Sequence, residues 1–267
     1  MGPATIARAT LLLEKPGAIR FSRADLGEAG VNIALLGDLS GHNEGGNKRP
    51  VDLDRAARDG VYGSWFKQTE GRIYINTEAK RQCAAAKGVM KRGGYHFADP
   101  SVSRASFDIA DIQADANTEA WHYLRTRRDQ LQAPELPDLI DFERGISQRI
   151  GRQLLALAWT STRKHEANAL WALTILDTVE QATGREPWIY LPLWVFNAYF
   201  RRAPAELLKR LMSHKNLIAS YNGGAGPERI PPGSEDWGGW QFTATGRIDG
   251  IDGNVDLSWA LLEDLNG

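Results

Sequence analysis

Two acidic residues one position apart, Asp141 and Glu143, are the feature of this chain best suited to chemistry. The apolar residues Leu139 and Ile140 precede them, which predicts a short buried strand that ends in charge. Because side chains alternate along a strand, we expect both carboxylates on one side, with their Cα atoms about 6.6 Å apart. Burial and mutual repulsion would raise the pKa of one carboxyl and leave a proton donor beside an anion. Such a pair can cleave a glycosidic bond, although two solvated strand-end acids would show the same pattern.

Short apolar runs and helical stretches alternate along the chain from residue 31 onward. The expected strands cover residues 31–38, 61–71, 93–98, 136–143, 187–191, 217–221 and 238–243. The expected helices cover residues 51–60, 77–92, 103–131, 166–183 and 204–213, and the segment 254–265 completes the pattern. This order predicts an α/β fold with a parallel sheet, most economically a single (β/α) barrel-like domain of irregular TIM type.

Polar side chains recur where these strands end. They are Asp38, Lys67, Glu70, His96, Asp141, Glu143, Tyr190, Tyr221, Gln241 and Asp256. In an α/β barrel the C-terminal ends of the strands meet at one face, where the active site lies. The sequence therefore predicts a bowl of acids and aromatics at one end of the barrel. By alternation His96 lies on the opposite side of its strand from Tyr95, so we expect it to anchor the structure rather than to catalyse.

The composition narrows the range of partners. A chain of 267 residues with 42% hydrophobic and 24% charged residues is ordinary for one globular α/β domain. The formal net charge of −1 provides no overall basic field for nucleic acid or an anionic membrane. No apolar run reaches the roughly 18 residues of a membrane helix, so we expect neither nucleic-acid binding nor membrane insertion. The single cysteine, Cys83, and histidines without metal-ligand spacing predict no metal site and no cofactor.

Five sequence blocks occur in an ordered series. They read GDLSGHN at residues 37–43, KQTEG at 67–71, GGYHFA at 93–98, LIDFE at 139–143 and WQFTATGRIDGIDGNVD at 240–256. In this order the chain resembles glycoside hydrolase family 25, the muramidases (lysozymes) of bacterial, fungal and phage lysins, over about residues 31–262. We expect residues 31–267 to form the catalytic domain, and residues 1–30, which match no block, to form an N-terminal appendage of unknown role.

The resemblance implies hydrolysis of the β-1,4 bond between N-acetylmuramic acid and N-acetylglucosamine in peptidoglycan. It assigns Glu143 the general acid/base role, and Asp141 an assisting role in which it orients a group or stabilises positive charge. Asp38 and Asp256 would line the same bowl. The residues leave three mechanisms open: retention assisted by the N-acetyl group of the substrate, retention through an enzyme nucleophile, and inversion.

Substrate contacts are expected from further residues near the strand ends. Tyr95 would donate a hydrogen bond to the acetamido carbonyl of a sugar, and Tyr190, Trp194 and Trp240 are candidate platforms for sugar rings. Glu70 is expected either at the rim of the site or in an ion pair with a nearby lysine. We expect the partner of these residues to be a peptidoglycan glycan strand, bound by a monomeric protein.

Two further expectations concern an insertion and the location of the protein. Residues 144–166 make the connection after the LIDFE strand longer than is usual in the family, which predicts an extra helix, a lid or a flap that contacts the cell wall. The N-terminal residues contain no apolar run long enough for a secretory signal peptide. An enzyme of the cell wall would then need release through a phage holin, delivery with a virion, or another export route.

Two alternative functions stay open at this point. One is hydrolysis of another N-acetylhexosaminide by a chitinase-like enzyme, although the D-x-x-D-x-D-x-E signature typical of such chitinases is absent before Glu143. The other is a non-catalytic glycan-binding component of a phage or cell wall, which the presence of both candidate acids disfavours. Clearing of a peptidoglycan suspension, with Glu143→Gln as the control, distinguishes a muramidase from both.

Overall fold

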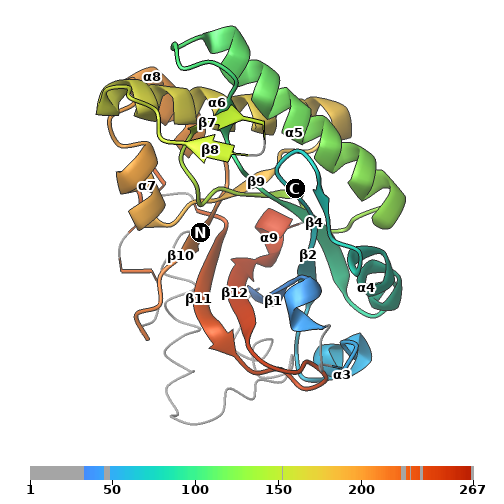
Figure 1. The fold of residues 1–267 in the computed structure, drawn as a ribbon. Coiled ribbons are helices and arrows are strands. Elements are labelled where there is room, and N and C mark those ends of the chain that lie inside the picture. The colour runs from blue at the N-terminus through green and yellow to red at the C-terminus, as the bar shows by residue number, and fades with distance from the viewer. Residues whose placement is uncertain are drawn as a thin grey trace.

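The structure is a computed structural model, which describes residues 33–44, 49–151, 153–223, 227–228, 230–234 and 237–265. The N-terminal appendage expected at residues 1–30 lies outside these residues. The described chain forms a closed β-barrel, and the long helices pack together against its outside (Figure 1). The prediction of an irregular α/β barrel is confirmed.

Eight strands of the described chain close the barrel. In pairing order they are β1 (Ile33–Leu39), β2 (Gly63–Glu70), β4 (Lys91–Phe97), β6 (Leu139–Asp141), β9 (Trp188–Tyr190), β10 (Asn216–Ala219), β11 (Gly239–Gly246) and β12 (Val255–Leu261). Pairing of β12 with β1 completes the ring, and β3 (Tyr74–Ile75) extends the end of β2 outside it. Each neighbouring pair from β1 to β11 is parallel, as the alternation of strands and helices predicts.

β12 is the exception to the expected parallel sheet, because it runs antiparallel to both β11 and β1. Only residues 247–254 connect β11 to β12, and a parallel neighbour would need a crossover of about a dozen residues or more. Gly250 and Gly253 have φ angles of 90° and 95°, which allow the short connection to reverse the chain. The prediction of a fully parallel sheet is therefore wrong at this strand.

The two long helices, α5 (Ile109–Gln130) and α6 (Ser161–Thr183), lie side by side (Figure 1). The other described helices are α3 (Leu53–Arg58), α4 (Ala79–Ala86), α7 (Leu193–Tyr199), α8 (Ala205–Met212) and α9 (Leu262–Leu265), and a 3-10 turn, η1 (Gly41–Asn43), follows β1. At the start of α5 the Asp108 carboxylate accepts a hydrogen bond from the Ala110 N–H, and Gly184, with a φ of 69°, ends α6. The sequence pattern predicts each long helix but not α7.

Core packing fixes the direction of the chain at the end of β6. Phe142 is fully buried, and its ring packs against those of Trp171 on α6 and Phe200, with centroid distances of 5.8 and 4.8 Å. Because neighbouring side chains alternate in an extended chain, this anchor sends Asp141 and Glu143 to the other side. The apolar residue between the two acids therefore holds their common orientation.

The connection after β6 forms a hairpin where an extra helix, a lid or a flap was expected. β7 (Ser147–Ile150) and β8 (Gln153–Leu155) pair antiparallel, and β7 joins β5 (Ser101–Val102) in a second, smaller sheet. An ion pair of 2.8 Å between Arg149 Nη2 and Asp99 Oδ2 ties this hairpin to the segment that follows β4. The first part of the 144–166 segment is therefore a hairpin and not an extra helix, and its end belongs to α6.

Candidate active site

A cavity of about 40 Å³ lies at the end of the barrel where the parallel strands have their C-termini. Its lining consists of Asp38, Tyr95, Leu139, Asp141, Glu143, Tyr190, Gln241 and Asp256. These residues come from β1, β4, β6, β9, β11 and β12, and from the segment directly after β6. The structure thus brings together the four acids and two of the tyrosines that the sequence singled out.

The reversed direction of β12 explains how Asp256 reaches this cavity. Asp256 lies near the start of β12, and an antiparallel strand begins where its neighbours end. In the register of β1 with β12, Asp38 lies directly opposite Asp256. Burial, and to a smaller extent the charge of the facing Asp256, raises the pKa of Asp38 to about 8.

Asp141 and Glu143 form an interacting pair of half-buried carboxyls. Burial, and then the charge of Glu143, raises the pKa of Asp141 well above its ordinary value. Burial and the charge of Asp256 also raise the pKa of Glu143, while Arg144 and Lys67 oppose that rise. Because both pKa values are raised, the pair retains a proton at a pH where isolated carboxyls are ionised.

Gln241 connects the acids to two tyrosines. Its Nε2 donates to Asp38 Oδ2 at 2.9 Å, which lowers the pKa of Asp38 against the effect of burial. Its Oε1 accepts from the Tyr190 hydroxyl at 3.2 Å and from the Tyr221 hydroxyl. The amide is 3% exposed and is therefore held in one orientation, with its nitrogen facing the carboxyl. Gln241 was recognised in the sequence only as a strand-end polar residue, and its place in the sheet between β10 and β12 is what gives it this role.

Tyr95 and His96 lie on opposite sides of β4, as alternation predicts. Burial and the charge of Asp141 raise the pKa of Tyr95 well above its ordinary value, so its hydroxyl stays a neutral donor in the cavity. His96 is completely buried, and its ring nitrogens form hydrogen bonds of 2.8 Å to Thr69 Oγ1 and 2.9 Å to Glu119 Oε2. Burial lowers the pKa of His96 to about 3, which makes it a neutral structural residue, as expected.

A network of ion pairs surrounds the cavity on the side of β2. Glu70 pairs with Lys67 at 2.7 Å and with Arg144 at 3.1 Å, and Arg144 also approaches Asp99 at 3.6 Å. Partial burial favours a higher pKa for Glu70, but Lys67 and Arg144 together lower it below its ordinary value. Glu70 does not line the cavity. Of its two expected roles, the ion pair with a nearby lysine is the one observed.

Two of the candidate sugar platforms do not line the cavity. Trp240 is 2% exposed, packs in the core with Phe242 and Trp259, and donates its indole N–H to the Ser220 carbonyl at 2.8 Å. Because Gln241 faces the cavity, alternation turns the preceding Trp240 away from it, and the prediction that Trp240 contacts sugar is wrong. Trp194, on α7, is 55% exposed and remains available to a ligand outside the cavity.

Within the described part of the chain, no three His, Cys, Asp or Glu side chains are grouped so that they could hold a metal ion. None of the described helices is long and apolar enough to cross a membrane.

Comparison with known proteins identifies the family. The model of the family described as glycosyl hydrolases family 25 matches residues 38–251. The chain belongs to this family. Lysozyme M1 of Streptomyces globisporus is 28% identical to it over 199 residues, which are 74% of this chain and 59% of that protein. The chain thus spans less than two thirds of that relative.

Solved structures of similar proteins share this family 25 fold. The bacterial lysozyme of Streptomyces coelicolor has a TM-score of 0.61 at 19% identity, covering 87% of this chain and 97% of that one. The family GH25 lysozyme of Aspergillus fumigatus has a TM-score of 0.60 at 21% identity, covering 85% and 93%. The spore cortex lytic enzyme SleM of Clostridium perfringens has a TM-score of 0.64 at 20% identity, covering 87% and 69%. At these identities the likeness concerns the fold.

Proposed function

We propose that this family 25 chain is an N-acetylmuramidase, which hydrolyses the β-1,4 bond between N-acetylmuramic acid and N-acetylglucosamine in peptidoglycan. The observation that carries the proposal is the cavity in which Asp38, Asp141, Glu143 and Asp256 meet at the strand ends. The relative from Streptomyces globisporus is named a lysozyme. The autolysin LytC of Streptococcus pneumoniae, with the same fold at a TM-score of 0.60, has been solved with a synthetic peptidoglycan ligand.

Glu143 is the general acid/base in this proposal. Its raised pKa keeps a proton available for the leaving oxygen at a pH where an ordinary glutamate has lost it. It is half-buried and lies beyond the end of β6, so its carboxyl can reach a glycan outside the barrel. Arg144 and Lys67 limit the rise in pKa, and this keeps Glu143 able to give up its proton and take it back.

Asp141 is the assisting acid, and its buried environment lets it hold a proton more tightly than an ordinary aspartate does. Its raised pKa makes it a proton-holding partner of Glu143 in the free protein. Its Oδ1 is buried and has no hydrogen-bond partner among the described residues. An unpaired buried acceptor is costly, and the N–H of an acetamido group would satisfy it. Tyr95, in the register next to Leu139 on β6, would donate to the carbonyl of the same acetamido group.

The polar groups of the cavity favour the N-acetyl substituent of a sugar as the part that enters it. The orphaned Asp141 Oδ1 and the hydroxyl of Tyr95 lie in the same cavity lining, where an acetamido N–H and carbonyl can pair with them. The N-acetyl group of a bound sugar is therefore the part directed into the cavity. This arrangement supports retention assisted by the N-acetyl group over the other two mechanisms.

The experiment is the clearing of a purified peptidoglycan suspension, followed by reduction of the new chain ends and identification of the reduced sugar. Reduced muramic acid identifies a muramidase, whereas reduced glucosamine would contradict the proposed bond. Glu143→Gln should lower the rate about 10²–10⁴-fold, and near-normal turnover would refute its role. Glu206→Gln makes the same chemical change at an exposed position on α8 and serves as the matched control.

The chitinase-like alternative is tested in the same experiment with chitin oligosaccharides. A higher rate on these than on peptidoglycan would favour it, and binding without hydrolysis of either substrate would favour a glycan-binding component. We further propose that the protein acts as a monomer at the cell wall, to be tested by light scattering and by lysis of whole cells from outside.

A further inference from the structure

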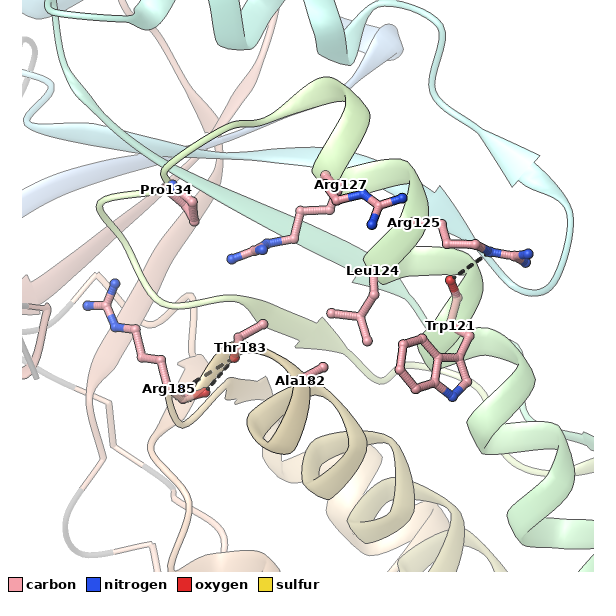
Figure 2. Close-up of a pocket in the computed structure, with 9 residues that line it drawn as sticks. Trp121, Leu124, Arg125, Arg127, Pro134, Ala182, Thr183 and Arg185 are labelled. Carbon is pink, nitrogen blue, oxygen red and sulfur yellow. Dashed lines mark hydrogen bonds between the residues drawn. The ribbon is translucent and has the colours of Figure 1, made fainter.

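A second and larger cavity, of about 490 Å³, lies between the ends of α5 and α6 (Figure 2). Its lining consists of Trp121, Leu124, Arg125, Arg127, Arg128, Pro134, Ala182, Thr183 and Arg185. Pro134 precedes β6, and Arg185 precedes β9. The cavity therefore lies at the N-terminal end of the strands, at the opposite end of the barrel from the acidic bowl. Its volume is within the range of sites for small ligands.

Four of the lining residues are arginines, and none is acidic. Arg127 is paired through its Nε with Asp138 at 2.6 Å. Arg128 is exposed, and its side chain has no hydrogen bond or ion pair to any described residue. Arg125 uses only its Nε, which donates to the Trp121 carbonyl at 3.2 Å, so both of its terminal nitrogens are available. The guanidinium groups of Arg125 and Arg128 can therefore donate hydrogen bonds to a ligand without breaking an existing contact.

The groups that contact the lining arginines offset only part of their positive charge. Asp138 supplies one negative charge, and the C-termini of α5 and α6 supply about −0.5 each, which offsets about two of the four guanidinium charges. Asp129 and Glu135 are neighbours of lining residues in the sequence, but they do not line the cavity, and Glu135 pairs with Arg92. Capping of the two helices therefore accounts for only part of the arginine content. Burial, together with the charge of Arg127, lowers the pKa of Arg185 despite the opposing effect of Asp138. This concentration of arginines in a lining without acids contrasts with the net charge of −1 for the whole chain.

We propose that this arginine pocket binds the phosphate group of a phosphate ester. A carboxylate has two oxygens and is satisfied by one guanidinium fork, whereas the oxygens of a phosphate can accept from several forks at once. Trp121 lines the same cavity and is 53% exposed, which offers an apolar face to the organic part of the ester. The pocket is separate from the bowl, so the proposal does not depend on the activity at Glu143.

The phosphate could be free or could belong to a polymer joined by phosphodiester bonds, and titration calorimetry on the full chain separates these sources. The probes are inorganic phosphate, glycerol phosphate and a poly(glycerol phosphate), each measured at two salt concentrations. Tighter binding of the polymer per phosphate group identifies a polymeric ligand, and equal binding identifies the isolated phosphate. Polyglutamate tests the chemistry, because binding as tight as that of the phosphate polymer would overturn the preference for phosphate.

The double variant Arg125→Gln/Arg128→Gln should weaken binding about tenfold or more, because two charge-assisted donors are lost. Arg125→Lys/Arg128→Lys keeps the charge but not the forks, and should recover only part of the affinity. Arg58→Gln, an exposed arginine on α3, is the matched control and should bind as the wild type does. Unchanged affinity in the glutamine double variant, or an equal loss in Arg58→Gln, would overturn the proposal. Unchanged melting temperature and unchanged hydrolysis of a short glycan confirm that the variants are folded.

Discussion

Replacement of Gln241 is the most direct test of how the acidic bowl is held together. Gln241→Met keeps a similar side-chain length and volume but removes both hydrogen-bonding ends of the amide. Asp38 then loses its donor at 2.9 Å, and the hydroxyls of Tyr190 and Tyr221 lose their shared acceptor. Without the hydrogen bond from Gln241, the pKa of Asp38 should rise above its present value of about 8.

The expected loss of stability follows from the burial of the groups left unpaired. The Asp38 carboxyl would have no hydrogen-bond partner among the described residues, whereas the hydroxyl of Tyr190 would keep its contact with that of Tyr221. An orphaned buried group costs about 1–3 kcal/mol. We therefore expect Gln241→Met to lower the free energy of unfolding by roughly 1–3 kcal/mol and the melting temperature by about 2–12 °C.

Urea unfolding and initial rates on a soluble glycan fragment measure the two consequences. Tyr221→Phe removes only the exposed hydroxyl and is the control, with an expected loss below about 1 kcal/mol. If Gln241 orients Asp38, kcat should fall while KM changes little, because the carboxyl acts on the reacting centre more than on binding. A Gln241→Met protein with wild-type stability and a rate within twofold of wild type would refute the inference that Gln241 holds Asp38, Tyr190 and Tyr221 in place.

The remaining predictions concern pH and packing. Asp256→Asn should move the alkaline limb of activity to lower pH, because the charge of Asp256 raises the pKa of Glu143, which acts in its protonated form; initial rates across pH measure this. Arg144→Gln should move the same limb to higher pH, because Arg144 lowers that pKa, and shifts in the same direction would contradict both assignments. Folding raises the pKa of Asp38 from 3.8 to about 8. The contribution of protonated Asp38 to stability is therefore fully present below pH 3.8 and is lost as the pH rises through about 8. The free energy of unfolding should thus fall by up to about 6 kcal/mol over that range, and Asp38→Asn should flatten the dependence measured by urea unfolding at several pH values. Phe142→Ala should cost about 3–5 kcal/mol of stability and misplace both neighbouring acids; a cost below 1 kcal/mol would contradict the anchoring role of Phe142.

Periodicity in the sequence was sufficient to predict most of the barrel, because short apolar runs and long helical stretches differ in their repeat. It could not give the direction of β12, since an alternating pattern reads the same along either direction of a strand. The available signal was the length of the connection at residues 247–254, which is too short for a crossover. The hairpin within residues 144–166 was also missed, because β7 and β8 are half-buried or exposed and lack an apolar period; the turn at Gly151, with a φ of 58°, was the only local mark.

The candidate site was predicted best where residues fall at strand ends within a motif, as Asp38, Asp141 and Glu143 do. Prediction failed for Trp240, because a large aromatic residue in a motif suggests a sugar platform as readily as a core position. Because Trp240 and Gln241 point to opposite sides of the strand, alternation distinguishes a core position of Trp240 from a sugar platform only once Gln241 is known to face the cavity. The hydrogen bonds of the Gln241 amide to Asp38 and Tyr190 join β11 to β1 and β9. These strands are distant in sequence, so no local pattern could have revealed the hydrogen bonds.

The irregular strand and the acidic cluster are one structural feature. Had β12 run parallel to its neighbours, its start would lie at the far end of the barrel, and Asp256 would face the end where the arginine pocket lies. Its reversal places Asp256 opposite Asp38, where the charge of Asp256 adds to the effect of burial in making Asp38 harder to ionise, and a proton is retained among the four acids. The short connection at residues 247–254, which forces the reversal, therefore contributes to the chemistry as directly as the strand that carries Asp141.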